Sequence, residues 1–155
     1  MRKSWERILA PNTNSITVDG VDAGYGAVRV LQNVSLSVGS GETVVLLGTN
    51  GNGKSTLMKC IMGWVRPTKG SITAEIDGEK HDLAALTTEQ IVDLGIALVP
   101  EGRRLFPRQT VEENLLLGAS RKKAREHIKT NLDFCFEIFP RLAERKSQLA
   151  GSMSG

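Results

Sequence analysis

The chain has 155 residues, 40% hydrophobic and 24% charged, which is enough to bury the core of about one domain. Its formal net charge of +3 is too small to indicate a nucleic-acid partner, and Cys60 and Cys135 are too few and too far apart to predict a disulfide framework or a zinc site. No stretch approaches 18 uninterrupted apolar residues, so the sequence predicts no helix that spans a membrane by itself.

The N-terminal third predicts a loose leader followed by strands. Residues 1–14 contain only a three-residue apolar run, too short for the hydrophobic region of a signal peptide. Residues 15–25 and 28–38 are rich in β-branched residues and predict two strands. The turn GSGE follows, and the apolar run TVVLL at residues 43–47 then predicts a third, buried strand.

A glycine-rich loop comes directly after this apolar run and opens a helical pattern. The sequence GTNGNGKST matches the spacing G-x-x-x-x-G-K-[ST]. Glycines allow backbone N–H groups to approach phosphate oxygens, the helix N-terminus favours anions, Lys54 adds a mobile positive charge, and the Ser55 hydroxyl can ligate Mg²⁺. The residues expected to bind the nucleotide phosphates are Gly48, Thr49, Asn50, Gly51, Asn52, Gly53, Lys54, Ser55 and Thr56.

The rest of the chain alternates between strand and helix signals. A helix is expected over residues 54–64, a strand over 71–76, a turn over 77–80, a short helix over 87–95 and a buried strand over 96–100. Thr110 followed by Glu113 forms a capping-box pattern that opens a helix, and residues 121–138 are expected to continue as one helix. The predicted fold class is therefore α/β.

Two further segments narrow the class of protein. Tyr25, in the sequence GYG, resembles the aromatic residue that stacks on adenine in ATP-binding cassette (ABC) ATPases. The sequences at residues 30–63 and 98–119 resemble the ATPase subunits of branched-chain amino acid importers and their close relatives, the urea and short-amide importers. The resemblance covers about residues 18–155.

This resemblance implies the layout of the domain. It implies a P-loop NTPase core of ABC type over residues 15–155, with an antiparallel β subdomain, an α-helical subdomain at about 102–150, and an incomplete C-terminal part. Residues 152–155 resemble the start of the family signature, usually Leu-Ser-Gly-Gly-Gln or Leu-Ser-Gly-Gly-Glu. Ser154 and Gly155 would then contact the ATP held by a second subunit, whereas the same letters read alone would predict a flexible tail.

The resemblance also assigns catalytic and metal roles. Glu101 occupies the position where most family members carry a glutamine that reaches Mg²⁺ and the attacking water, and the branched-chain branch often carries glutamate there. Lys54 and Glu101 are therefore the expected catalytic residues, and Ser55 and Glu101 the expected Mg²⁺ ligands. The neighbouring Arg103 and Arg104 either face a permease or are solvated.

The implied function is that of an ATP-binding subunit, with ATP and Mg²⁺ as cofactors, that energises import of branched-chain amino acids or a related small amide such as urea. Its partners would be a second ABC ATPase subunit, transmembrane permease subunits and, indirectly, a periplasmic solute-binding protein, at the cytoplasmic face of the inner membrane. In the family the metal-holding aspartate, the catalytic glutamate and the switch histidine follow the signature. We therefore expect this chain alone to hydrolyse ATP negligibly.

Two rival functions remain open from the residues. One is a nucleotide-binding module without turnover. Measuring both nucleotide affinity and phosphate release would distinguish such a module from an ATPase. The other is a P-loop kinase or a GTPase, since the same loop serves all these classes. A GTPase would be expected to show an Asn-Lys-x-Asp motif, which this sequence does not contain.

Overall fold

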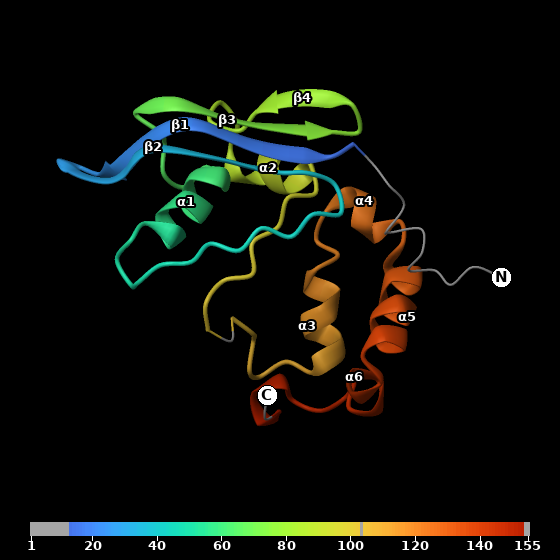
Figure 1. Ribbon diagram of the computed structural model, residues 1–155. Coiled ribbons are helices and arrows are strands. Elements are labelled where there is room, and N and C mark those ends of the chain that lie inside the picture. The colour runs from blue at the N-terminus through green and yellow to red at the C-terminus, as the bar shows by residue number, and fades with distance from the viewer. Residues whose placement is uncertain (1–12, 103, 154–155) are drawn as a thin grey trace. The chain divides into compact units, whose positions relative to one another are not determined.

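The computed structural model describes residues 13–153 apart from Arg103 (Figure 1). The chain divides into two compact units, one ending at Leu98 and the other beginning at Val99. Within the described residues, no helix is long and apolar enough to cross a membrane.

A four-stranded antiparallel sheet forms the first unit. Its strands are β1 (Ser15–Tyr25), β2 (Val28–Val38), β3 (Lys69–Ile76) and β4 (Glu79–Asp82), in the order β2-β1-β3-β4. The strands predicted at residues 15–25 and 28–38 are confirmed with the same bounds. The tight turn that joins β1 to β2 has Gly26 at φ +55°, in the left-handed region that glycine adopts at little steric cost.

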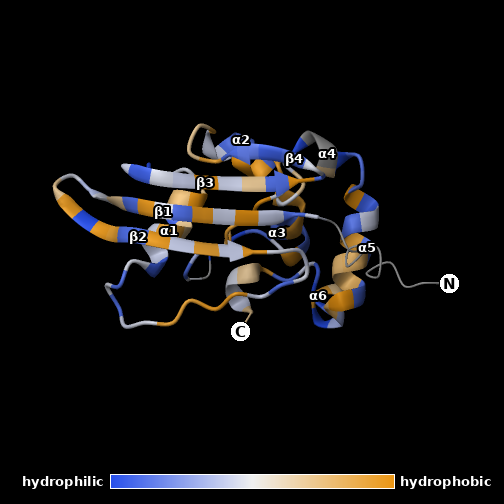
Figure 2. Cartoon of the chain, turned by 45° about the horizontal axis from the view of Figure 1, so that its top comes forward, coloured by the Kyte–Doolittle hydropathy of each residue, from blue (hydrophilic) through white to orange (hydrophobic). Residues whose placement is uncertain are grey.

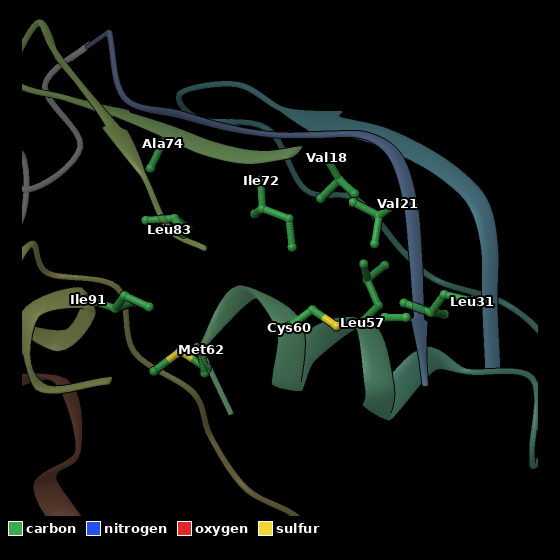
Figure 3. Packing of buried hydrophobic residues seen from close by; sticks show 11 residues of the cluster. Val18, Val21, Leu31, Leu57, Cys60, Met62, Ile72, Ala74, Leu83 and Ile91 are labelled. Atoms are coloured by element: carbon green, nitrogen blue, oxygen red, sulfur yellow. The ribbon is translucent and has the colours of Figure 1, made fainter. Parts of the chain in front are cut away.

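Two helices complete this unit. Helix α1 (Lys54–Ile61) and helix α2 (Thr88–Asp93) supply apolar side chains that meet those of the sheet, as Figure 3 shows. Each large aliphatic side chain buried in this way contributes about 1.5–3 kcal/mol to folding. The core consists of Val18, Val21, Ala23, Leu31, Leu57, Cys60, Met62, Ile72, Ala74, Leu83 and Ile91.

Two predicted strands are absent from the described residues. Residues 43–47 and 96–100 carry no strand, and the first run appears in Figure 2 as a hydrophobic stretch of the loop between β2 and α1. Leu46 packs against the core, but Leu47 is 89% exposed and Val99 is 92% exposed. The predictions were wrong because an apolar run signals burial, whereas a strand also needs a hydrogen-bonded neighbour.

The second unit is helical. It contains α3 (Val111–Leu117), α4 (Lys122–Arg125), α5 (Ile128–Ile138), α6 (Pro140–Glu144) and the short 3-10 helix η2 (Ala150–Ser152). The single helix predicted over 121–138 is wrong, because the chain leaves helical geometry at His127, where φ is −124°. The preceding stretch RKKAREH has too few apolar residues to form a face that packing could stabilise. The helix predicted up to Trp64 is also shorter and ends at Ile61.

In the second unit, backbone hydrogen bonds join the segment at residues 107–111 to the segment at residues 148–151. The N–H of Val111 donates to the Gln148 carbonyl at 3.0 Å, and the N–H of Gly151 donates to the Pro107 carbonyl at 3.1 Å. Space at this junction is limited, since a Cβ added at Gly151 would lie 2.8 Å from the Pro107 Cβ. The segment that precedes α3 is thus held beside the segment that leads to η2.

The capping box predicted at the start of α3 is confirmed. The Thr110 hydroxyl accepts a hydrogen bond from the N–H of Glu113 at 3.2 Å, and the Glu113 carboxylate accepts one from the N–H of Thr110 at 2.7 Å. The pKa of Glu113 is lowered from its ordinary value of 4.5, first by the backbone hydrogen bond from Thr110 and then by the Thr110 hydroxyl. These bonds therefore favour the ionised carboxylate.

The capping box predicts a pH dependence of stability. A lowered pKa in the folded state gives stabilisation that is fully present above the unfolded pKa and is lost as the pH falls through the folded pKa. Glu113→Gln should therefore lower the free energy of unfolding at pH 7 and remove part of the decline in that free energy below about pH 4.5. Urea unfolding at several pH values measures both effects.

Glu112→Gln is the matched control, because it changes the neighbouring acid of the same helical turn and leaves the capping pair intact. An identical pH profile for wild type and Glu113→Gln would contradict the role assigned to the capping carboxylate.

Candidate functional site

The candidate site is the loop of residues 48–53 and the start of α1. The helix begins at Lys54, directly after Gly53, which is its N-cap residue with φ +81°. Within the described part of the chain, no side chain caps this helix and no acidic residue lies in its first turn. The first N–H groups of α1 are therefore presented to an anion without competition from a carboxylate.

Of the three glycines of the loop that have positive φ, Gly51 and Gly53 are favoured for different reasons. Gly51 has φ +91° and no atom within 4 Å of an added Cβ, so only its conformation favours glycine. Gly53 is buried, and an added Cβ would lie 2.6 Å from Leu31 Cδ2 and 3.3 Å from Val30 Cγ1. Gly53 thus lets the loop lie against β2.

The Lys54 ammonium group closes the loop on itself. Its Nζ atom donates to the carbonyl oxygens of Gly48 at 2.7 Å and Thr49 at 2.8 Å. Both acceptors are neutral, whereas phosphate oxygens are charged and form shorter, stronger hydrogen bonds with ammonium groups. The loop, the uncapped helix start and the lysine together fit a polyphosphate group.

The other loop residues surround this lysine. Thr49, Asn50 and Asn52 are exposed, and the N–H of Asn52 donates weakly to the Thr49 carbonyl at 3.4 Å. Ser55 is exposed in the first turn of α1, where its hydroxyl could ligate Mg²⁺ beside bound phosphates. Thr56, by contrast, is only 6% exposed.

Tyr25 contacts the same helix although it lies at the end of β1. Its side chain is 46% exposed, and its hydroxyl accepts a hydrogen bond from Lys59 Nζ at 3.3 Å. Side-chain hydrogen bonding to Thr56, and then to Lys59, lowers the pKa of Tyr25 below its ordinary value of 10.0. The structure thus brings the predicted base-stacking ring to the helix that follows the phosphate loop.

The remaining predicted site residues belong to the second unit or lie outside the described residues. Glu101 is exposed and belongs to the second unit, while Ser55 belongs to the first, so the structure describes each only in its own surroundings. Arg104 Nε donates to the Glu101 carbonyl at 3.4 Å, and Arg103 lies outside the described residues. Ser154 and Gly155 also lie outside the described residues.

Comparison with known proteins decides the family. The sequence pattern of the family described as ABC transporter matches residues 31–155. The chain belongs to the ABC transporter family. It is 44% identical over 140 residues to the high-affinity branched-chain amino acid transport ATP-binding protein BraG of Pseudomonas aeruginosa, an alignment covering 90% of this chain and 58% of BraG.

Sugar-import proteins are also similar to this ABC transporter chain. The ribose import ATP-binding protein RbsA of Chromobacterium violaceum is 41% identical over 103 residues, which are 66% of this chain and 20% of RbsA. The arabinose import ATP-binding protein AraG of Azospirillum brasilense is 39% identical over 108 residues, which are 70% of this chain and 20% of AraG. The chain thus spans little more than half of BraG and a fifth of these two.

Solved structures support the predicted ABC-type α/β fold. The ADP conformation of an ATP-binding cassette of an ABC transporter matches with a TM-score of 0.72 and 24% identity, over 93% of this chain and 60% of that chain. A structure described as the ATP-binding subunit of an ABC transporter matches with a TM-score of 0.68 and 32% identity, over 90% and 55% of the two chains. The predicted fold class is confirmed.

Sequence reasoning missed one side chain of the candidate site. Lys59 contacts Tyr25 across 34 positions of the chain. Its position near the end of an expected helix predicts a solvated cation that interacts favourably with the negative end of the helix dipole. No short sequence motif pairs such a lysine with an aromatic residue. Only the fold, which places the end of β1 beside α1, makes the contact visible.

The two left-handed glycines predict different costs of substitution. Both Gly51→Ala and Gly53→Ala place a Cβ on left-handed backbone, which costs about 1–2 kcal/mol. Gly53→Ala should cost about 1–3 kcal/mol more, because its Cβ also collides with the buried Leu31. Urea unfolding without nucleotide measures the difference, and equal losses for the two variants would contradict the tight contact at Gly53.

Proposed function

We propose that this chain is the ATP-binding part of an importer ATPase that energises uptake of branched-chain amino acids or a related small amide such as urea. The phosphate loop carries the nucleotide part of the proposal, since Lys54 and the uncapped start of α1 face the same anion site. The similarity to BraG over 90% of the chain supports the solute class.

The proposed binding mode follows from the loop. Phosphate oxygens of ATP would replace the Gly48 and Thr49 carbonyls as acceptors for Lys54, because a charged acceptor binds the ammonium group more strongly. The Ser55 hydroxyl would ligate Mg²⁺ together with phosphate oxygens, and the Tyr25 ring would stack on the base. Mg²⁺ would supply charge neutralisation at the β- and γ-phosphates.

Glu101 and the signature residues have proposed roles of a different kind. An ionised carboxylate at residue 101 can ligate Mg²⁺ and accept a proton or hydrogen bond from water, but it cannot donate a hydrogen bond as glutamine does. Ser154 and Gly155 would contact the ATP of a second subunit. Because Tyr25, the loop and α1 form one unit, base and phosphate binding need no movement between the two units.

The proposed setting is an assembly at the cytoplasmic face of the inner membrane. There the chain would pair with a second ABC ATPase subunit and dock on permease subunits, and a periplasmic solute-binding protein would deliver the solute. ATP binding would close the ATPase pair and hydrolysis would reopen it. We also propose that a polypeptide limited to residues 1–155 binds ATP with negligible turnover, because the family's water-orienting residues follow the signature.

Nucleotide binding is tested with Lys54→Ala. Removing an ammonium group that makes charge-assisted hydrogen bonds to phosphate should weaken binding of Mg²⁺ and ATP about tenfold to hundredfold in isothermal titration calorimetry. Lys80→Ala, which removes an exposed lysine from β4, is the matched control and should bind as the wild type does. Equal affinities for wild type and Lys54→Ala would contradict the proposed site.

The solute class is tested by exchange into a relative. BraG carrying residues of this chain in place of its own matching segment should restore leucine uptake to a Pseudomonas aeruginosa strain that lacks BraG, and Lys54→Ala should abolish the uptake. RbsA and AraG match over shorter stretches and make a sugar the alternative solute. Restored ribose uptake by a matching RbsA exchange, without restored leucine uptake, would favour the sugar.

A further inference from the structure

The contact between Lys59 and Tyr25 joins α1 to the end of β1. Lys59 Nζ donates to the Tyr25 hydroxyl at 3.3 Å and lies 5.5 Å from the centroid of the ring. A hydrogen bond of this length is weak, so the positive charge of the ammonium group near the ring also contributes to the contact. Because Tyr25 remains 46% exposed, part of the ring surface is still open to a ligand.

Three residues of α1 act on the Tyr25 hydroxyl. Hydrogen bonds to Thr56 and Lys59 lower the pKa of Tyr25, and the positive charge of Lys59 adds to this effect. Cys60 acts in the opposite direction, and burial raises the pKa of the Cys60 thiol itself. Lys59 is thus the cation that holds the hydroxyl end of the ring.

We propose that Lys59 is a positioning residue for the base-binding ring of Tyr25, an inference that rests on the proposed nucleotide site. The ammonium group holds the ring at its hydroxyl end, while part of the ring surface stays open to a purine. A cation bonded to the hydroxyl also draws electron density from the ring, which reduces repulsion when the electron-rich face of a purine stacks on it. Lys59 therefore strengthens binding of the base and not of the phosphates.

The contact itself is tested by titrating Tyr25. It is the single tyrosine of the chain, so the ultraviolet absorbance of the phenolate reports this residue alone. Lys59→Met should raise the titration midpoint, because the ionised ring loses a cation and a hydrogen-bond donor. Lys59→Arg should keep the midpoint near that of the wild type, and so should the charge-matched control Lys80→Met. An unchanged midpoint in Lys59→Met would overturn the inference.

The role in base binding is tested with two ligands. Lys59→Met should bind Mg²⁺ and ATP about two- to fivefold more weakly than the wild type, and inorganic tripolyphosphate, which has no base, with unchanged affinity. Lys59→Arg should restore ATP binding. Equal losses for both ligands would assign Lys59 to general attraction of phosphate, and no loss for either would remove it from the site; both results overturn the inference.

The two proposals fail in different ways. If the wild-type chain binds neither ATP nor tripolyphosphate, the proposed nucleotide site is wrong and the positioning role falls with it. If the wild type binds ATP and Lys59→Met binds it equally well, the nucleotide site stands and only the role of Lys59 is wrong.

Discussion

The packing of α1 against the sheet is the contact on which the rest of the candidate site depends. Leu57 and Cys60 are 3% and 0% exposed, and they lie among side chains of β1, β2 and β3. Because α1 begins only three residues before Leu57, burying this face also fixes the helix start and the phosphate loop. One of these strands, β1, ends at Tyr25, so one core positions both the phosphate-binding and the base-binding groups.

Local sequence patterns predicted those parts of the molecule whose structure is decided locally. Strands β1 and β2 follow from β-branched residues bounded by a glycine turn, and the Thr110–Glu113 capping box follows from residues three positions apart. The phosphate loop is likewise a short motif whose glycines are needed for its own backbone geometry. The predictions failed where structure depends on distant partners. Residues 43–47 show apolar character without pairing, and Lys59 reaches Tyr25 across 34 positions.

The nucleotide and the transported solute are supported by different kinds of information. The geometry of the loop at Lys54 and membership in the ABC transporter family support the proposal of nucleotide binding. The solute class rests on similarity to BraG, while RbsA and AraG show that chains of other import systems share much of the same sequence. A fold common to many importers supports ATP binding more directly than it supports the choice of solute.

The central claim is that one unit binds ATP through its loop and through Tyr25 together. The most direct measurement is an NMR titration of the chain with ATP and Mg²⁺, following the backbone amides of Gly51, Gly53 and Lys54 and the ring signals of the single tyrosine. The amide and ring signals should shift with the same dissociation constant. Shifts confined to residues outside the loop, or a tyrosine ring that stays unchanged when the loop saturates, would contradict it.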